Sequence, residues 1–274
     1  MESAAGRADP VLRRRGVVAV AGLAAGLLAG AAVASTPPDG SVPLAVAVPV
    51  VVLAGWTFLA AALLIPRDGL VPVVRVLLAA TGFAWLAGTV GFLDVLPARA
   101  AGALVGNIWL ALLAHLLLTF PDGRVSGAAR RGAVVVAYLL SGPTTALVVV
   151  SGTDVVAWGA ALAQMSFGVV LAGVLAHRVR TMPPGRRRVL APVMAGGVAV
   201  VVALIAVQTL QIVVAGAADL SPGGVTDVDV AVAAVLGLFP AGLAVAAGRT
   251  HLDRARIADV LGELDRALPG SALR

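Results

Sequence analysis

The sequence predicts an all-α fold, a polytopic transmembrane helix bundle of about eight spans with both termini in the cytoplasm. Hydrophobic residues make up 60% of the 274 residues and charged residues only 12%, which is too apolar for a water-soluble domain of this length. Apolar stretches of about 20 residues, long enough to cross a bilayer as helices, alternate with short polar loops. Nineteen of the twenty arginines fall in the termini and in every second loop, and only Arg99 lies in the opposite set. Because basic loops stay in the cytoplasm, this pattern fixes the predicted orientation.

The spans follow one another between turn-forming segments. Pro37, Pro38 and Gly40 end the first span, and Pro66 and Gly69 end the second. Apolar runs bounded by such segments or by arginines place the eight spans at about residues 16–34, 42–65, 73–93, 101–120, 132–150, 155–177, 189–214 and 228–248. The bundle thus covers residues 16–248, between a basic cytoplasmic N-terminus at 1–15 and a cytoplasmic helix at 249–274.

Two details qualify individual spans. The Gly142–Pro143 pair at mid-depth of the fifth span predicts a kink, because proline cannot donate a helical hydrogen bond. The first span has a second interpretation, since Arg13–Arg15, an apolar run and Ala32-Val33-Ala34 also form a secretory signal peptide. Its apolar run exceeds the usual 7–15 residues of such peptides, which favours a retained span. Cleavage would leave seven spans in unchanged orientation.

Polar residues inside the spans are rare, and four positions of the fourth span share one helical face at a spacing of four: Asn107, Ala111, His115 and Thr119. Polar groups in lipid are costly unless they face the bundle interior. One interpretation is a ligand-binding or proton-sensing face centred on His115. The other is a seam of interhelical hydrogen bonds. Three glutamines of the sixth and seventh spans are candidate partners for this face: Gln164, Gln208 and Gln211.

Glycines recur at intervals of four in two places, and small residues at this spacing allow helix backbones to approach closely. They are Gly22, Gly26 and Gly30 in the first span, and Gly102 and Gly106 in the fourth. Packing within the chain and contact with a second copy are both compatible with this spacing, and internal packing is favoured because glycines are frequent throughout the chain.

Composition also excludes several kinds of site. The absence of cysteine rules out disulfides and thiolate ligands, and no cluster of histidine or acidic residues predicts a metal site or catalytic group. The chain is strongly basic, but its arginines flank membrane spans, where anionic lipid attracts them, so nucleic acid is not an expected partner. We expect no cofactor. The longest loop on the arginine-poor side, residues 215–227, is too short to fold as an extracellular domain.

Two segments carry a resemblance to a known family. The first is the end of the fourth span, Leu116-Leu117-Leu118-Thr119-Phe120-Pro121-Asp122-Gly123-Arg124. The second follows the last span, from Arg249 through Arg254-Ala255-Arg256-Ile257-Ala258-Asp259 to Leu264. Both resemble the N-terminal membrane-sensor region of actinobacterial histidine kinases that pair with LuxR-type response regulators. The resemblance implies a membrane-embedded input module of a two-component system that passes a membrane or small-molecule cue to a cytoplasmic kinase.

The chain departs from that family in lacking the kinase core. No phosphoacceptor histidine in a helical hairpin and no glycine-rich phosphate loop are present, so ATP would bind only if a kinase core follows. The LuxR-type regulator would likewise be reached through that core. Four apolar residues of the C-terminal segment are spaced as a coiled-coil seam, which predicts a parallel homodimer: Ile257, Leu261, Leu264 and Leu268. A helix lying flat on the lipid headgroups is the alternative interpretation of this segment.

A different class of function remains open. A small polytopic transporter or channel, or an accessory membrane subunit, would also place a polar face inside the bundle. The absence of charged residues from the span centres disfavours ion or proton coupling. A membrane-embedded enzyme is disfavoured because no span carries paired acids or a Ser–His couple.

Overall fold

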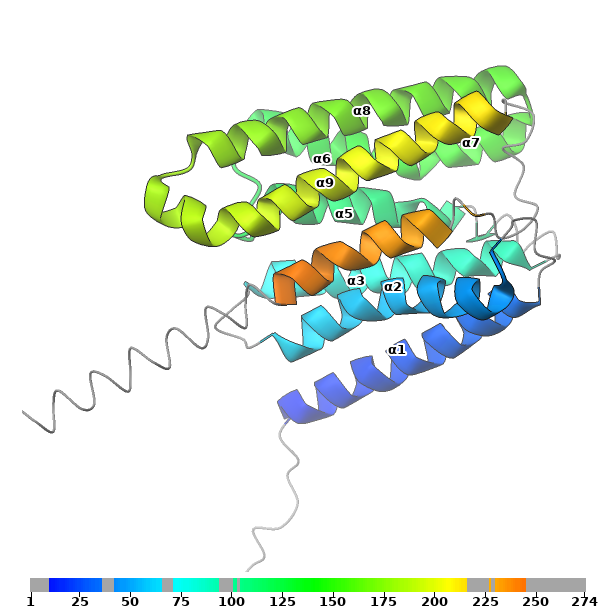
Figure 1. The fold of residues 1–274 in the computed structure, drawn as a ribbon, viewed down its shortest axis with the longest axis horizontal. Coiled ribbons are helices and arrows are strands. Elements are labelled where there is room, and N and C mark those ends of the chain that lie inside the picture. Colours follow the sequence, from blue (N-terminus) through cyan, green and yellow to red (C-terminus); the bar gives the residue numbers. More distant parts are fainter. Residues whose placement is uncertain are drawn as a thin grey trace, which may run out of the picture.

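The computed structural model describes residues 10–35, 42–65, 71–93, 101–102, 104–215, 227 and 230–244. Within these residues the chain is helical and contains no strand, which confirms the predicted all-α bundle. The helices lie roughly along one long axis and alternate in direction (Figure 1). They are α1 (Pro10–Ala34), α2 (Leu44–Leu64), α3 (Pro72–Gly88), the 3-10 turn η2 (Thr89–Phe92), α5 (Ile108–Thr119), α6 (Ala128–Ser141), α7 (Pro143–Ser151), α8 (Asp154–Thr181), α9 (Pro184–Ala215) and a last helix, Val230–Ala244.

The helices have the composition of a membrane protein. Among the described residues, five helical segments are long and apolar enough to cross a membrane, and further apolar stretches lie at 104–119, within α9 at 193–207, and at 230–244. Many large apolar side chains point outward, including Leu27 on α1, Leu64 on α2 and Val150 on α7. Exposed apolar surface distributed in this way is unfavourable in water and is expected of helices that face lipid. The structure therefore supports a transmembrane bundle.

The first two helices pack closely because glycines face the neighbouring helix. A Cβ atom at Gly22 would lie 2.7 Å from Leu59 Cδ1 on α2, and one at Gly26 would overlap the Trp56 indole. The Trp56 indole N–H donates to the Gly22 carbonyl at 3.0 Å. The glycine spacing of the first span thus serves packing within the chain.

Helix α5 lies at the centre of the bundle, between α3 on one side and α6, α8 and α9 on the other (Figure 1). Eight of its twelve residues are buried, and apart from His115 and Thr119 its sequence is apolar. A helix whose apolar residues extend around most of its surface is expected to be surrounded by protein. Leu116, Leu117 and Leu118 are all fully buried and anchor the main core.

The fifth predicted span is two helices, α6 and α7, separated at Gly142. Pro143 begins α7, where its missing N–H is tolerated, and it leaves the Leu139 carbonyl without the usual backbone donor. The break occurs at the Gly142–Pro143 pair from which a kink is predicted.

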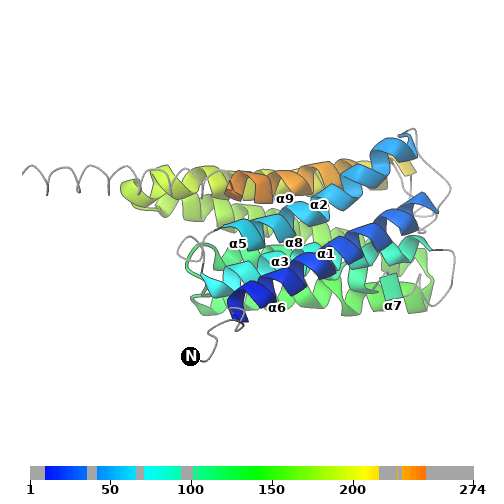
Figure 2. The same cartoon turned by 90° about the horizontal axis from the view of Figure 1, so that it is seen from below.

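The last helix returns to the first half of the bundle and lies beside α2 (Figures 1 and 2). Phe239 packs against Phe58, with ring centroids 6.4 Å apart. Near the opposite end, the backbone N–H of Val42 donates to Asp227 Oδ1 at 2.9 Å.

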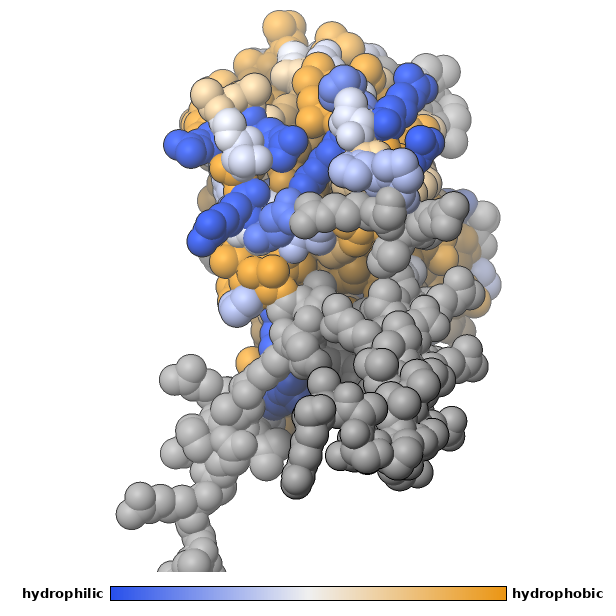
Figure 3. Space-filling view, turned by 90° about the vertical axis from the view of Figure 1, so that its left-hand side faces the viewer, coloured by the Kyte–Doolittle hydropathy of each residue, from blue (hydrophilic) through white to orange (hydrophobic). Residues whose placement is uncertain are grey.

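The described arginines gather at one end of the bundle, as the alternating loops predict. Figure 3 views this end and shows hydrophilic residues among hydrophobic ones on its upper part. Arg75 donates to the Ile65 carbonyl at 3.2 Å and so ties the end of α2 to the start of α3. Further described arginines lie near the start of α1, in the α5–α6 turn, at the start of α6, at the end of α8 and at the start of α9: Arg15, Arg124, Arg130, Arg131, Arg178, Arg180 and Arg187.

Several predictions concern residues outside the described part of the chain. These are the N-terminal residues 1–9 and the C-terminal helix 249–274, with its seam of Ile257, Leu261, Leu264 and Leu268.

Candidate functional site

A cavity of about 390 Å³ lies inside the bundle, between the α2–α3 half and the α7–α8 half. Its wall also includes residues from η2, α5 and α9, and Val232 from the last helix. The cavity is thus bordered by helices that are far apart in sequence. A volume of this size falls within the range of small-molecule sites, which is about 300–1,000 Å³.

One wall of the cavity is shaped by a close approach of two backbones. Gly88 at the end of α3 and Gly106 before α5 face each other, and a Cβ atom on Gly88 would lie 2.7 Å from the Gly106 Cα. Two tryptophans extend this wall, Trp85 from α3 and Trp109 from α5. Their rings are 5.2 Å apart at 83°, the edge-to-face arrangement that aromatic pairs prefer. The Trp85 indole N–H is bound to the Val51 carbonyl at 2.8 Å, which fixes the ring.

Polar side chains from several elements line the cavity. Asn107, in the turn that precedes α5, donates through Nδ2 to Thr145 Oγ1 at 2.8 Å. Thr145 in turn donates to the Ser141 carbonyl at 2.8 Å. Both Asn107 and Thr145 line the cavity, so this chain of hydrogen bonds lies on its surface. Thr89 of η2 also lines it and donates to the Leu86 carbonyl.

The break between α6 and α7 supplies the carbonyl groups that these side chains bind. Three successive carbonyls before the break accept from side chains: Leu139 from Thr144 Oγ1 at 3.0 Å, Leu140 from Gln164 Nε2 at 3.3 Å, and Ser141 from Thr145 Oγ1. Carbonyl groups freed at mid-membrane depth need such donors, because lipid offers none. Gln164 comes from α8 and lines the cavity as well. Irregular helical backbone beside a cavity is typical of ligand sites in membrane bundles.

A second, smaller cavity of about 90 Å³ adjoins the first. The two share Leu110, Gln164 and Leu204 as wall residues. Apart from Gln164 and Ser141, the wall of the smaller cavity is apolar.

The predicted polar face of the fourth span is divided by the structure. Asn107 faces the cavity, whereas His115 lies further along α5, with its Nδ1 atom 3.3 Å from the Tyr138 hydroxyl oxygen on α6. The two rings are nearly perpendicular. Thr119 is buried and donates to the His115 and Leu116 carbonyls of its own helix.

Among the described residues, the partners of this face come from α6 and α7. Gln164 shares the cavity with Asn107 but binds the Leu140 carbonyl, and Gln208 and Gln211 lie on α9 with side chains outside the described part of the structure. Sequence reasoning missed Tyr138, Thr145 and the two tryptophans Trp85 and Trp109. Tyr138 and Thr145 could have been found from their positions in the sequence. Two residues that are equally far before and after the turn between antiparallel helices lie at the same depth in the membrane.

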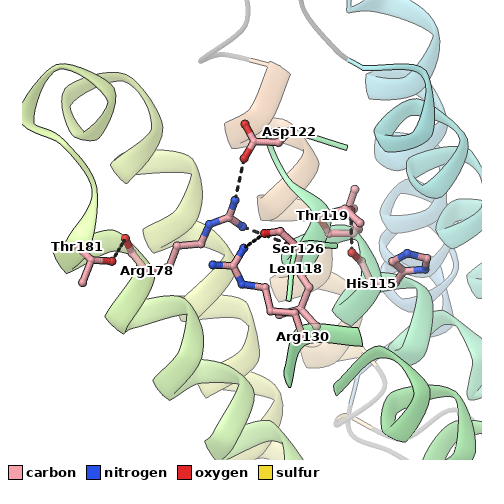
Figure 4. A network of polar contacts seen from close by, with 9 residues as sticks. His115, Leu118, Thr119, Asp122, Ser126, Arg130, Arg178 and Thr181 are labelled. Carbon is pink, nitrogen blue, oxygen red and sulfur yellow. Dashed lines mark hydrogen bonds and ion pairs between the residues drawn. The ribbon is translucent and has the colours of Figure 1, made fainter. Parts of the chain in front are cut away.

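The family-like segment Phe120–Arg124 forms the turn at the arginine end. Gly123 adopts a left-handed φ of +68° and its backbone N–H donates to the Thr119 carbonyl. Figure 4 shows Arg178 of α8 reaching into this turn, where it donates to the Leu118 carbonyl at 3.3 Å and pairs with Asp122 at 3.4 Å. Arg130 binds the Ser126 hydroxyl at 3.0 Å nearby. The segment therefore joins α5 to α8.

Comparisons with protein-family models, with curated proteins and with solved structures found no match for this chain.

Proposed function

We propose that the chain is the membrane-embedded input module of a two-component histidine kinase. In this proposal the bundle lies in the plasma membrane as a multi-pass protein with both termini in the cytoplasm. A membrane-dissolved or small-molecule cue binds in the cavity, and the change passes along the last helix to the segment 249–274.

The proposal rests on one observation, that the last helix forms part of the cavity wall. Val232 of the last helix contributes to the same wall as Asn107 and Gln164. The neighbouring Ala233 is buried against α2. A ligand can shift the equilibrium between two conformations of a protein only if its contacts differ between them. A ligand in this cavity would touch the helix that leads directly into the cytoplasmic segment, so such contacts are available.

The partners follow from the resemblance in the sequence. A kinase core beyond the segment 249–274 would bind ATP and phosphorylate a LuxR-type response regulator, and the module itself would act as a homodimer. In the proposed dimer, Ile257, Leu261, Leu264 and Leu268 form a parallel seam with the same residues of the second copy.

Cysteine crosslinking in membranes tests this proposal, and the chain offers a clean background because it has no cysteine of its own. Single cysteines at positions 257, 261, 264 or 268 should crosslink efficiently, because these positions face the partner helix. Cysteines at 259 or 263 are matched controls on the acidic face and should crosslink poorly. Equally weak crosslinking at all six positions would contradict the dimeric signalling helix.

The broken helix favours one alternative, a small transporter. Discontinuous helices beside a central cavity are a recurrent feature of secondary transporters, and the α6–α7 break has this arrangement. A transporter does not need a parallel dimer of the C-terminal segment, so uniformly weak crosslinking would favour it.

A further inference from the structure

The ligand of the cavity can be described from the chemistry of the wall. Among the described residues that line it, none carries a charge: the polar side chains are Thr89, Asn107, Thr145 and Gln164, and the others are apolar or aromatic. A charged ligand would leave its charge in an apolar bundle without a counter-ion, which is strongly unfavourable. The wall therefore selects a neutral molecule.

The two amide side chains have hydrogen-bonding capacity beyond the bonds described above. An amide has two N–H donors and one carbonyl acceptor. Asn107 uses one N–H on Thr145, and Gln164 uses one on the Leu140 carbonyl. Among the described residues, none binds Asn107 Oδ1 or Gln164 Oε1. Each amide can thus accept from one ligand group and donate to another, which matches a hydroxyl or carbonyl.

The rest of the wall favours an aromatic or other flat ring. Trp85 and Trp109 present a fixed edge-to-face pair, and aromatic rings prefer partners in offset or edge-on geometry. The smaller cavity behind Gln164 continues this space with apolar walls, among them Phe167 and Leu171. An apolar extension of the ligand would fit there once the Gln164 side chain turns aside.

We infer that this cavity binds a neutral, ring-containing amphiphile, whose hydroxyl or carbonyl group bonds to Asn107 and Gln164 while its ring packs against Trp85 and Trp109. The inference deepens the proposed function by naming the class of molecule that the module would detect. Binding is measured separately from signalling, so the two can fail independently.

Three probes with one ring system test the inference: naphthalene, 2-naphthol and 2-naphthoate at neutral pH. Equilibrium dialysis compares their saturable binding to the full chain in lipid nanodiscs with protein-free nanodiscs as the partition control. We expect 2-naphthol to bind at least about fivefold more tightly than naphthalene, as one additional hydrogen bond allows. We expect 2-naphthoate to bind about a hundredfold more weakly than 2-naphthol, because its carboxylate would be buried unpaired.

Two variants test whether Asn107 and Gln164 cause the tighter binding of 2-naphthol than of naphthalene. Asn107→Leu and Gln164→Leu should each reduce the advantage of 2-naphthol over naphthalene, and either variant suffices if the other does not fold. Ser166→Ala is the matched control, because Ser166 lies near Gln164 on α8 but is exposed and binds only the Leu162 carbonyl among the described residues. It should leave all three affinities unchanged.

Several results would overturn the inference: no saturable binding of any probe, equal affinity for all three, 2-naphthoate binding as tightly as 2-naphthol, or an undiminished preference in both leucine variants. If 2-naphthol binds as expected but leaves crosslinking at position 261 unchanged, the inference stands and its coupling to the kinase fails. If crosslinking follows the predicted seam but no probe binds, the proposed dimer stands and the ligand class is wrong.

Discussion

Individual polar side chains in this bundle join helices that follow one another in the chain. His115 and Tyr138 join α5 to α6, and Asn107 and Thr145 join the start of α5 to α7. In an apolar surrounding such contacts are worth about 0.6–2 kcal/mol each. They matter mainly for the register of the helices, because a slip of one residue would separate the two partners of each pair in apolar surroundings.

The contact between His115 and Tyr138 can be measured by a double-mutant cycle. His115→Leu should lower the free energy of unfolding by about 0.5–2 kcal/mol, because it removes an interhelical hydrogen bond. In a Tyr138→Phe background the same change should cost less, since the hydroxyl partner is already absent. Denaturation in mixed micelles provides the measurement. An equal cost in both backgrounds would show that His115 acts through something other than Tyr138.

In each of these contacts the two partners lie equally far from the turn between their helices, and this relation can be found in the sequence. Asn107 and Thr145 are 38 residues apart, and His115 and Tyr138 are 23 apart, so both pairs are centred near Ser126 in the α5–α6 turn. Gln164 and Leu140 are 24 apart and centred at Gly152. The approximate places of the apolar helices and of the kink could be predicted from apolar runs, glycine and proline. Several helix ends differ, since α8 continues to Thr181 and α9 begins at Pro184, beyond the predicted 177 and 189. The cavity could not, because it depends on how Trp85, Val232 and α8 meet across the two halves of the bundle.

Helix α1 packs against its neighbour through small side chains. It is apolar after Arg15 and exposes large side chains such as Leu27 and Leu28 on its outer face. Its inner face meets α2 at the glycine positions, where Trp56 and Leu59 occupy the space that a side chain would need. It also packs against α2 through the buried residues Ala29 and Val33.

Replacing one of these glycines should separate α1 from α2. Gly26→Leu should destabilise the bundle by about 1–3 kcal/mol, because the new side chain would overlap the Trp56 indole. Gly16→Leu is the matched control on the same helix, since a Cβ atom there meets nothing within 4 Å. Thermal unfolding in detergent, followed by tryptophan fluorescence, compares the two. An equal loss of stability in both variants would contradict the close packing of this face.

The whole bundle has one arginine-rich end and one end with almost no arginine, and this asymmetry predicts its orientation. Because basic loops remain in the cytoplasm, reporters that fluoresce only there should be bright when fused after Arg75, Arg131, Arg188 and Arg266. Fusions after Asp39, Ala98 and Gly223 should be dark. Cell fluorescence, normalised to expression, gives the readout. A bright fusion after Gly223 would mean that the last pair of spans is wrongly assigned.

The hydrogen bond from Arg178 to the Leu118 carbonyl attaches the arginine end of α8 to α5. Gln164, at the cavity, lies fourteen residues from Arg178, about 21 Å along the helix at 1.5 Å per residue. If a ligand displaces α8 at Gln164, the helix would pivot about its arginine end. The start of α8 near Asp154 would then move most and the arginine end least. Arg75 holds the α2–α3 pair in the same way through the Ile65 carbonyl. No arginine-to-carbonyl hydrogen bond of this kind holds the described residues of the helix Val230–Ala244. If the proposed function holds, a movement that begins in the cavity would therefore reach the arginine end most directly as a slide or rotation of that helix along its own axis.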